Sequence, residues 1–203
     1  MIEADDAGLR REFPRADADR AAMNRYSAAV RRRRFTSLLL ASLLACKPGV
    51  SSRAEPQTPQ AKTIYIVRHA EKQHVDGERD PELTEAGHGR AAALRERLAT
   101  VKLDAIFSSN YRRTLQTVAP LVDVTGLDIT LYDPAAPAAD FAESLRASPA
   151  TQLLIAGHSN TIPTLLAALG ATIEPIDEGR YGDLFIVTLQ GDAVDLRVER
   201  FGS

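Results

Sequence analysis

Histidine and arginine residues follow three short apolar runs of this sequence. Residues 68–71 read Arg-His-Ala-Glu, residues 108–113 read Ser-Ser-Asn-Tyr-Arg-Arg, and residues 157–160 read Gly-His-Ser-Asn. An arginine offers a planar fork of donors that matches phosphate oxygens, and it stays charged near pH 7. A histidine can be neutral at that pH, and is then a nucleophile or a base. If the three segments meet, they predict a pocket for an anionic substrate, most simply a phosphate ester or a phosphoramidate.

The segments that would position these residues alternate between strand and helix patterns. Runs of β-branched and apolar residues predict strands, and apolar positions at helical spacing predict helices. The predicted strands are 63–67, 103–107, 128–132, 152–156, 183–189 and 193–201, and the predicted helices are 84–101, 110–124, 139–147 and 161–169. This order predicts an α/β fold, a three-layer α/β/α sandwich with a mostly parallel central sheet and a C-terminal antiparallel hairpin. Ligands of such sheets bind beyond the carboxyl ends of the strands, where the histidines and arginines fall.

Four blocks of sequence, in order, resemble the histidine phosphatase superfamily, which includes phosphoglycerate mutase. The first is Arg-His-Ala-Glu at 68–71, and the second is Leu-Thr-Glu-Ala-Gly at 83–87. The third runs from Ser109 through Arg113 and Thr114 to Gln116 and Thr117, and the fourth is Gly-His-Ser-Asn at 157–160. The resemblance covers about residues 61–203, and it implies the same sandwich fold.

The resemblance also implies a role for each site residue. His69 would attack phosphorus and carry a phosphohistidine, Arg68 and Arg113 would clamp the phosphoryl oxygens, and His158 would stabilise the charge that develops on the transferring group. No metal and no other cofactor is required, because arginines and histidines do the neutralising. Arg112 competes with Arg113 for its role, but the spacing from Ser109 favours Arg113.

The general acid is the point at which the sequence departs from the family. Many members carry a glutamate soon after the third strand, whereas this chain has Asp133 there, followed by Asp140 and Glu143. Asp133 equally suits a turn before Pro134. Glu71, beside the predicted nucleophile, is another carboxylate that could carry the proton. These four candidates stay open at this stage.

The predicted activity is hydrolysis of phosphate monoesters or related phosphorylated compounds, with a phosphorylated small molecule as the partner. A phosphomutase and a non-catalytic lipoprotein that binds phosphate or sugar phosphate are the alternatives. A net charge of −2 and a pI near 6.1 give no global field for nucleic acid, so no nucleic-acid partner is expected. The sequence contains neither the serine-hydrolase motif G-x-S-x-G nor the nucleotide-binding motif G-x-x-x-x-G-K-[ST], so these two classes of enzyme are disfavoured. Zinc held by His69, His158 and Glu71 is disfavoured by the neighbouring arginines.

Residues 1–45 are predicted to be an N-terminal extension and a signal peptide of the lipoprotein type. Four arginines at 31–34 precede an apolar stretch at 35–45, which is the layout of an export signal. The segment Leu-Leu-Ala-Cys at 43–46 resembles the lipobox of bacterial lipoproteins, in which Cys46 would carry the lipid. Because signal peptides normally begin with their basic residues, we expect translation to start at Met23.

The remaining boundaries follow from composition. Residues 46–62 are rich in proline, glycine and serine and predict a flexible tether, and residues 63–203 predict the histidine phosphatase domain. No apolar run reaches the roughly 18–20 residues of a spanning helix, so membrane contact is expected through the lipid anchor only. The expected location is the cell envelope, on the periplasmic face of the outer or the inner membrane, with Lys47 weakly favouring the outer one. The oligomeric state is left open.

Overall fold

The structure of the chain is a computed structural model, which describes residues 61–202. These residues belong to the second of two units into which the chain divides, Ala54–Ser203. The predictions for residues 1–60, including the lipidated Cys46 and the start at Met23, lie outside the described residues. Within the described residues, no helix is both long enough and apolar enough to cross a membrane.

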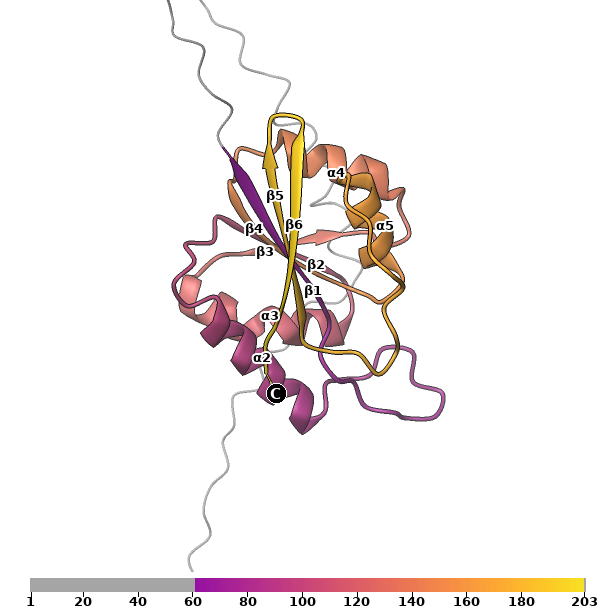
Figure 1. Cartoon of the computed structure of the whole chain (residues 1–203). Helices are drawn as coiled ribbons and strands as arrows, with labels where there is room; N and C mark the ends of the chain where they lie inside the picture. The colour runs from indigo at the N-terminus through magenta and orange to yellow at the C-terminus, as the bar shows by residue number, and fades with distance from the viewer. Residues whose placement is uncertain (1–60, 203) are drawn as a thin grey trace, which may run out of the picture. The chain divides into compact units, whose positions relative to one another are not determined.

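One six-stranded sheet runs through the domain in the order β3-β2-β4-β1-β5-β6 (Figure 1). β1, β2, β3 and β4 are parallel, whereas β5 is antiparallel to β1 and β6 to β5. A two-residue turn at Gly191 and Asp192 joins the last pair, and Gly191 has a positive φ of 59°, which glycine adopts readily. The strands are β1 (Lys62–Arg68), β2 (Ala105–Ser109), β3 (Ile129–Tyr132), β4 (Gln152–Gly157), β5 (Asp183–Gln190) and β6 (Ala193–Arg200).

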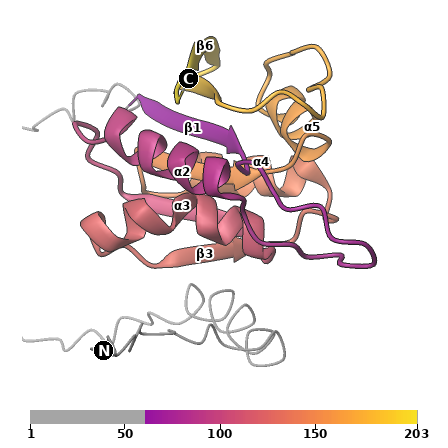
Figure 2. The same ribbon diagram turned by 90° about the horizontal axis from the view of Figure 1, so that it is seen from below.

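Two pairs of helices cover the two faces of this sheet (Figures 1 and 2). One pair is α2 (Glu85–Arg97) and α3 (Arg112–Thr125), and the other is α4 (Ala138–Ala147) and α5 (Thr161–Ala168). The predicted three-layer α/β/α sandwich, with its mostly parallel sheet and C-terminal antiparallel hairpin, is therefore confirmed. α3 begins two residues later than predicted, two larger sets of differences concern β2 and α2, and the remaining bounds differ by one residue at most.

The first difference is β2, which begins and ends two residues later than the predicted strand 103–107. Leu103 instead closes a short turn in which its N–H donates to the carbonyl of Val101. The two small polar residues Ser108 and Ser109 continue the strand because they are fully buried at its end. The second difference is α2, which ends at Arg97 and not at Val101 because the chain turns at Leu98.

The core explains why the central strands are apolar along their whole length. In β4, Leu153 and Ile155 pack toward α4 and α5, whereas Leu154 and Ala156 pack toward α2 and α3. All four side chains are fully buried. A strand covered on both faces has no solvent side, so its residues do not alternate between polar and apolar. This double cover fixes the register of β4 against β1, and with it the positions of the residues that follow each strand.

Candidate functional site

His69 and His158 leave the carboxyl ends of neighbouring parallel strands. Arg68 of β1 pairs with Gly157 of β4, and the N–H of His69 donates to the carbonyl of Gly157 over 2.9 Å. The next residue on each strand is a histidine, and the two ring centroids lie 5.4 Å apart. Only 3% of His69 and 8% of His158 is exposed. The structure thus brings together the two imidazoles that the sequence placed at one edge of the sheet.

The tautomer of His69 follows from its hydrogen bond to its own backbone neighbour. Nδ1 lies 2.8 Å from the carbonyl oxygen of Ala70. A carbonyl oxygen only accepts, so Nδ1 must carry the hydrogen, and in the neutral ring Nε2 keeps a free lone pair. Burial, together with the smaller effects of the Arg113 and Arg68 charges, lowers the pKa of His69 to about 3 against the opposing effect of the Ala70 hydrogen bond. His69 is therefore neutral near pH 7 and has the form that a nucleophile needs.

His158 is held in the opposite tautomer by a chain of hydroxyl groups. Its Nε2 lies 2.9 Å from Ser109 Oγ, which lies 2.9 Å from Thr114 Oγ1. The single hydrogen of Thr114 is within reach of two carbonyls, the closer being that of Tyr111 at 2.8 Å. Ser109 must then donate to Thr114, and it accepts from the Nε2–H of His158.

The other nitrogen of His158 faces an arginine. Nδ1 lies 3.5 Å from Nη2 of Arg113, which can only donate, so the lone pair of His158 points toward the guanidinium. Burial lowers the pKa of His158 to about 4, and the charges of Arg113 and Arg68 contribute in the same direction. This ring is therefore neutral near pH 7 as well.

Arg113 and not Arg112 enters the site. The guanidinium of Arg113 lies 4.3 Å over the ring of Tyr111, and its Nη1 is 3.6 Å from Oδ1 of Asp80. Its Nε is buried and has no hydrogen-bond partner among the described residues. Arg112, by contrast, is half exposed and forms an ion pair with Glu82. Arg113, which the spacing from Ser109 favoured, is therefore the arginine that lies beside His158.

Arg68 is buried and is held by a loop that the sequence analysis did not single out. Its Nη1 donates to the carbonyls of Asp177, Glu178 and Arg180 over 2.8–3.1 Å, and its Nη2 donates to the carboxylate of Glu178 over 2.8 Å. The guanidinium lies 4.3 Å from the ring centroid of Tyr181. Its Nε, like that of Arg113, is buried without a partner among the described residues. Two buried N–H donors beside the histidines are thus left for a ligand.

The third block of the sequence ties α3 to the turn after β1. Oγ1 of Thr117 accepts from the backbone N–H of Ala70 over 2.9 Å and donates to the carbonyl of Arg113 over 2.7 Å. Oε1 of Gln116 accepts from the N–H of Leu83 over 2.8 Å. The residues of this block after Arg113 therefore fix the backbone around His69, which gives their spacing a structural reason.

The second block starts α2 against the same turn. Thr84 caps the helix by accepting from the N–H of Gly87 over 3.1 Å, and its own N–H donates to the carbonyl of Glu71 over 2.9 Å. A Cβ on Gly87 would lie 2.3 Å from that carbonyl oxygen. Glycine is needed here because the helix start and the backbone after the predicted nucleophile approach so closely.

The structure places none of the four candidate acids beside the histidines as a free carboxyl group. Glu71 forms a two-pronged ion pair with Arg90, with contacts of 2.7–2.9 Å. Although burial acts to raise the pKa of Glu71, the hydrogen bonds from Arg90 bring it below its usual value. Asp133 is exposed and accepts from the N–H two residues along over 2.9 Å, which is the turn role foreseen for it. Asp140 and Glu143 are exposed on α4.

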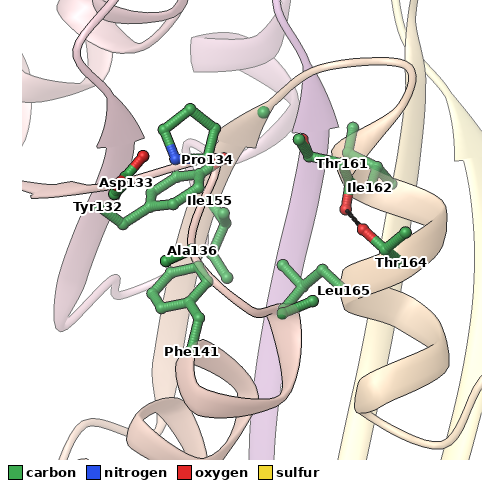
Figure 3. Close-up of a pocket in the computed structure, with 12 residues that line it drawn as sticks. Tyr132, Asp133, Pro134, Ala136, Phe141, Ile155, Thr161, Ile162, Thr164 and Leu165 are labelled. Atoms are coloured by element: carbon green, nitrogen blue, oxygen red, sulfur yellow. Dashed lines mark hydrogen bonds between the residues drawn. The ribbon is translucent and has the colours of Figure 1, made fainter.

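A pocket of about 320 Å³ opens beside His158, and its lining includes Tyr111, Arg113 and Thr161. That volume is enough for a phosphoryl group and a small leaving group. A second pocket of about 210 Å³ shares Pro134 and Thr161 with it. In Figure 3 the side chains of Tyr132 and Phe141 form one wall of this second pocket, and Thr161 and Leu165 of α5 form the other.

The second pocket has mostly apolar walls. Tyr132 and Phe141 stack with ring centroids 4.5 Å apart.

Within residues 61–202, no group of three His, Cys, Asp or Glu side chains is placed to hold a metal ion. The guanidinium groups of Arg68 and Arg113, which lie near the histidines, are groups that bind anions.

Comparison with known proteins shows what part of this chain is similar to a known family. Residues 64–136 match the family model of the Histidine phosphatase superfamily (branch 1), and this segment holds Arg68, His69 and Arg113. This segment is therefore similar to the histidine phosphatase superfamily, and it contains three of the four sequence blocks that resemble the family. His158 lies outside the matched segment, and it is the sheet that brings it to the site. No curated protein matches the chain significantly.

Several solved structures share the fold. One is a candidate phosphohistidine phosphatase, SixA, from Nakamurella multipartitia, which is 21% identical, with 72% of this chain and 99% of that chain covered and a TM-score of 0.55. A second candidate SixA, from Agrobacterium tumefaciens, is 24% identical, with coverages of 70% and 98% and a TM-score of 0.51. A mycobacterial glucosyl-3-phosphoglycerate phosphatase is 17% identical, with coverages of 71% and 100% and a TM-score of 0.55. At these identities the similarity establishes the fold.

Proposed function

We propose that this domain hydrolyses phosphate monoesters or related phosphorylated compounds through a phosphohistidine on His69. One observation carries the proposal: a neutral imidazole with its Nε2 lone pair free lies 5.4 Å from a second imidazole, and the buried Arg68 and the largely buried Arg113 are next to these histidines in the sequence or in space. Charge on the equatorial oxygens is what a phosphoryl-transfer site must neutralise, and Arg68 and Arg113 supply fixed positive charge for it. The superfamily match and the phosphatase names of its structural neighbours support the same class of reaction.

The proposed reaction has two steps. In the first, Nε2 of His69 forms a bond to phosphorus, the bond from phosphorus to the leaving oxygen breaks, and that oxygen leaves with the electron pair and takes up a proton. In the second, water attacks phosphorus, the P–N bond breaks, its electron pair returns to Nε2, and inorganic phosphate is released. Because Nδ1 donates to Ala70, the phosphoryl group is expected on Nε2 only.

The test uses a generic aryl phosphate, whose leaving group needs little protonation. The wild-type chain should turn it over, and rapid quenching in alkali followed by mass spectrometry should find phosphate on Nε2 of His69. Replacing His69 with Ala should lower turnover by roughly 10³-fold or more while the far-UV circular dichroism is unchanged. Residual activity within tenfold of the wild type would contradict the nucleophile assignment.

Two alternatives give different outcomes in the same assays. If the protein is a non-catalytic lipoprotein that binds phosphate or sugar phosphate, the wild type will bind phosphate tightly and show no turnover. If it is a phosphomutase, the phosphoryl group will reappear on an acceptor molecule, and little inorganic phosphate will be released.

We further propose that residues 1–45 carry a lipoprotein-type signal, that 46–62 are a tether and that 63–203 are the catalytic domain in the cell envelope. The motif at 43–46 and the composition of 47–62 motivate this assignment. In a bacterial host with two membranes, replacing Cys46 with Ser should move the protein out of the membrane fraction; unchanged fractionation would remove the lipoprotein proposal. N-terminal sequencing of the unprocessed variant should begin at Met23, and a peptide that spans residues 20–25 would exclude that start.

A further inference from the structure

Glu178, which lies between the end of α5 and the start of β5, reaches the residues next to both histidines. Its Oε2 accepts from Nη2 of Arg68 over 2.8 Å, and its Oε1 accepts from Oγ of Ser159 over 2.7 Å. Arg68 directly precedes His69, and Ser159 directly follows His158. The carboxylate therefore spans the two segments that deliver the imidazoles.

Glu178 contacts one of the two nitrogens of Arg68 that a two-pronged contact with a phosphoryl group would use. A guanidinium offers two-pronged faces, and one of them consists of Nε–H and the neighbouring N–H of Nη2. The Nη1 of Arg68 already donates to three backbone carbonyls, so it has no free hydrogen. What remains is the face made of Nε, which is buried and unpartnered within the described part of the chain, and Nη2, which Glu178 holds. Glu178 thus occupies half of the only two-pronged face that Arg68 has left.

From these contacts we infer that Glu178 is a further residue of the site, whose carboxylate takes the place of a phosphoryl oxygen on Arg68 and leaves it when substrate binds. The inference rests on the proposed function, because it takes a phosphoryl group as the ligand of Arg68. Two anions that contact the same guanidinium nitrogen repel each other. Binding of phosphate therefore displaces Glu178, and the return of Glu178 helps to release the product phosphate.

The side chain of Glu178 can move while the backbone of its loop stays in place. The side chain of Glu178 is 78% exposed, so it loses little packing when it turns into solvent. The backbone of the same loop stays tied to Nη1 of Arg68 through the carbonyls of Asp177, Glu178 and Arg180. Arg68 itself, with 3% of its side chain exposed, keeps its position. In the inferred exchange, phosphate replaces the carboxylate of Glu178 on the guanidinium of Arg68, which stays in place.

The experiment measures binding of inorganic phosphate to the full-length chain by calorimetry, which does not need turnover. Replacing Glu178 with Gln keeps the size and a neutral acceptor but removes the competing charge, so the Kd for phosphate should fall by roughly two- to fivefold. Replacing Glu174 with Gln is the matched control, because Glu174 is exposed on the same loop and makes no side-chain hydrogen bond with the described residues. Its Kd should equal that of the wild type. The gain in E178Q should shrink at high salt, since the competition is electrostatic.

Phosphate binding that is unchanged or weaker in E178Q would overturn the inference, and so would an equal gain in E174Q. A second readout excludes a role as general acid. If Glu178 protonated the leaving group, E178Q would lower kcat for an alkyl phosphate far more than for an aryl phosphate; the exchange predicts equal effects on both. If the wild type shows no turnover but E178Q binds phosphate with a lower Kd, the proposed reaction is refuted and this inference still holds.

Discussion

The stability of the domain should fall steeply between pH 7.5 and pH 5, because two buried histidines are neutral in the folded state. Burial lowers the pKa of His69 to about 3 and that of His158 to about 4. In the unfolded chain both rings titrate near 6.5. As the pH falls below that value, the unfolded state takes up protons that the folded state does not. The contribution is therefore fully present above pH 6.5 and is lost progressively toward pH 4 and then pH 3.

The size of this loss of stability follows from the difference between pH 5 and the pKa of histidine in the unfolded chain. Each pH unit below about 6.5 costs about 1.4 kcal/mol per histidine while the folded ring stays neutral. At pH 5 the loss is about 2 kcal/mol per ring, or about 4 kcal/mol for the pair. For a domain of this size that corresponds to a fall in Tm of roughly 8–16 °C. Glu71 and Glu178, whose pKa values are lowered, act at more acidic pH, so the comparison isolates the histidines.

Urea unfolding at pH 7.5 and pH 5 measures this difference. The wild type should lose about 4 kcal/mol of unfolding free energy, whereas a variant with both His69 and His158 replaced by Gln should lose less than about 1 kcal/mol. His88, which is exposed on α2, supplies the control, since His88→Gln should keep the whole loss. The reasoning is refuted if the double variant loses as much stability as the wild type, because the proton uptake would then lie elsewhere.

The two arginines at the start of α3 should differ sharply in an aryl phosphate assay. Arg113→Ala should lower kcat/KM by about 10²-fold or more, because Arg113 lies beside His158. Arg112→Ala should change kcat/KM by less than about threefold, since the side chain of Arg112 makes only a surface ion pair. Comparable losses in both variants would reject the assignment. Replacing Ser109 with Ala removes the acceptor of the His158 Nε2–H, so it should lower the unfolding free energy by about 1–3 kcal/mol and also lower kcat. Ser108→Ala is the control, because that buried hydroxyl donates only to a neighbouring carbonyl and kcat should hold.

The parts of the fold that the sequence predicted are those that local physics determines. β4 is apolar throughout because it is covered on both faces, and the turn at Gly191 needs a positive φ. The meeting of His69 and His158 follows from a general rule, since parallel strands end at one edge of the sheet. β2 was placed two residues early because its last residues are serines, whose burial depends on tertiary packing and not on their own propensity.

The parts that the sequence did not predict depend on contacts between distant segments. Glu178 and Tyr181 lie in an irregular loop, and they meet Arg68 from more than a hundred positions away. No periodicity marks such a loop, so no pattern singled them out. Glu71 was a plausible proton carrier by adjacency to His69, but Arg90, nineteen residues later, holds its carboxylate. The choice between a free carboxylate and a paired one is made by packing, which a single sequence does not display.

The charges around His158 indicate how this imidazole could act in the proposed reaction. Arg68 and Arg113 are buried cations, and their nearest carboxylates among the described residues are Glu178 at 2.8 Å and Asp80 at 3.6 Å. Adding a proton to His158 would place a further positive charge beside both guanidiniums, and this, together with burial, is why its pKa is about 4. A phosphoryl dianion on the guanidiniums reverses that balance, because it offsets their charge and accepts from a protonated ring. We therefore expect His158 to gain its proton on Nδ1 only when phosphate is bound, since Nε2 already donates to Ser109. Substrate binding would then produce the donor that stabilises the transferring group, while His69, whose Nδ1 is tied to Ala70, stays a nucleophile.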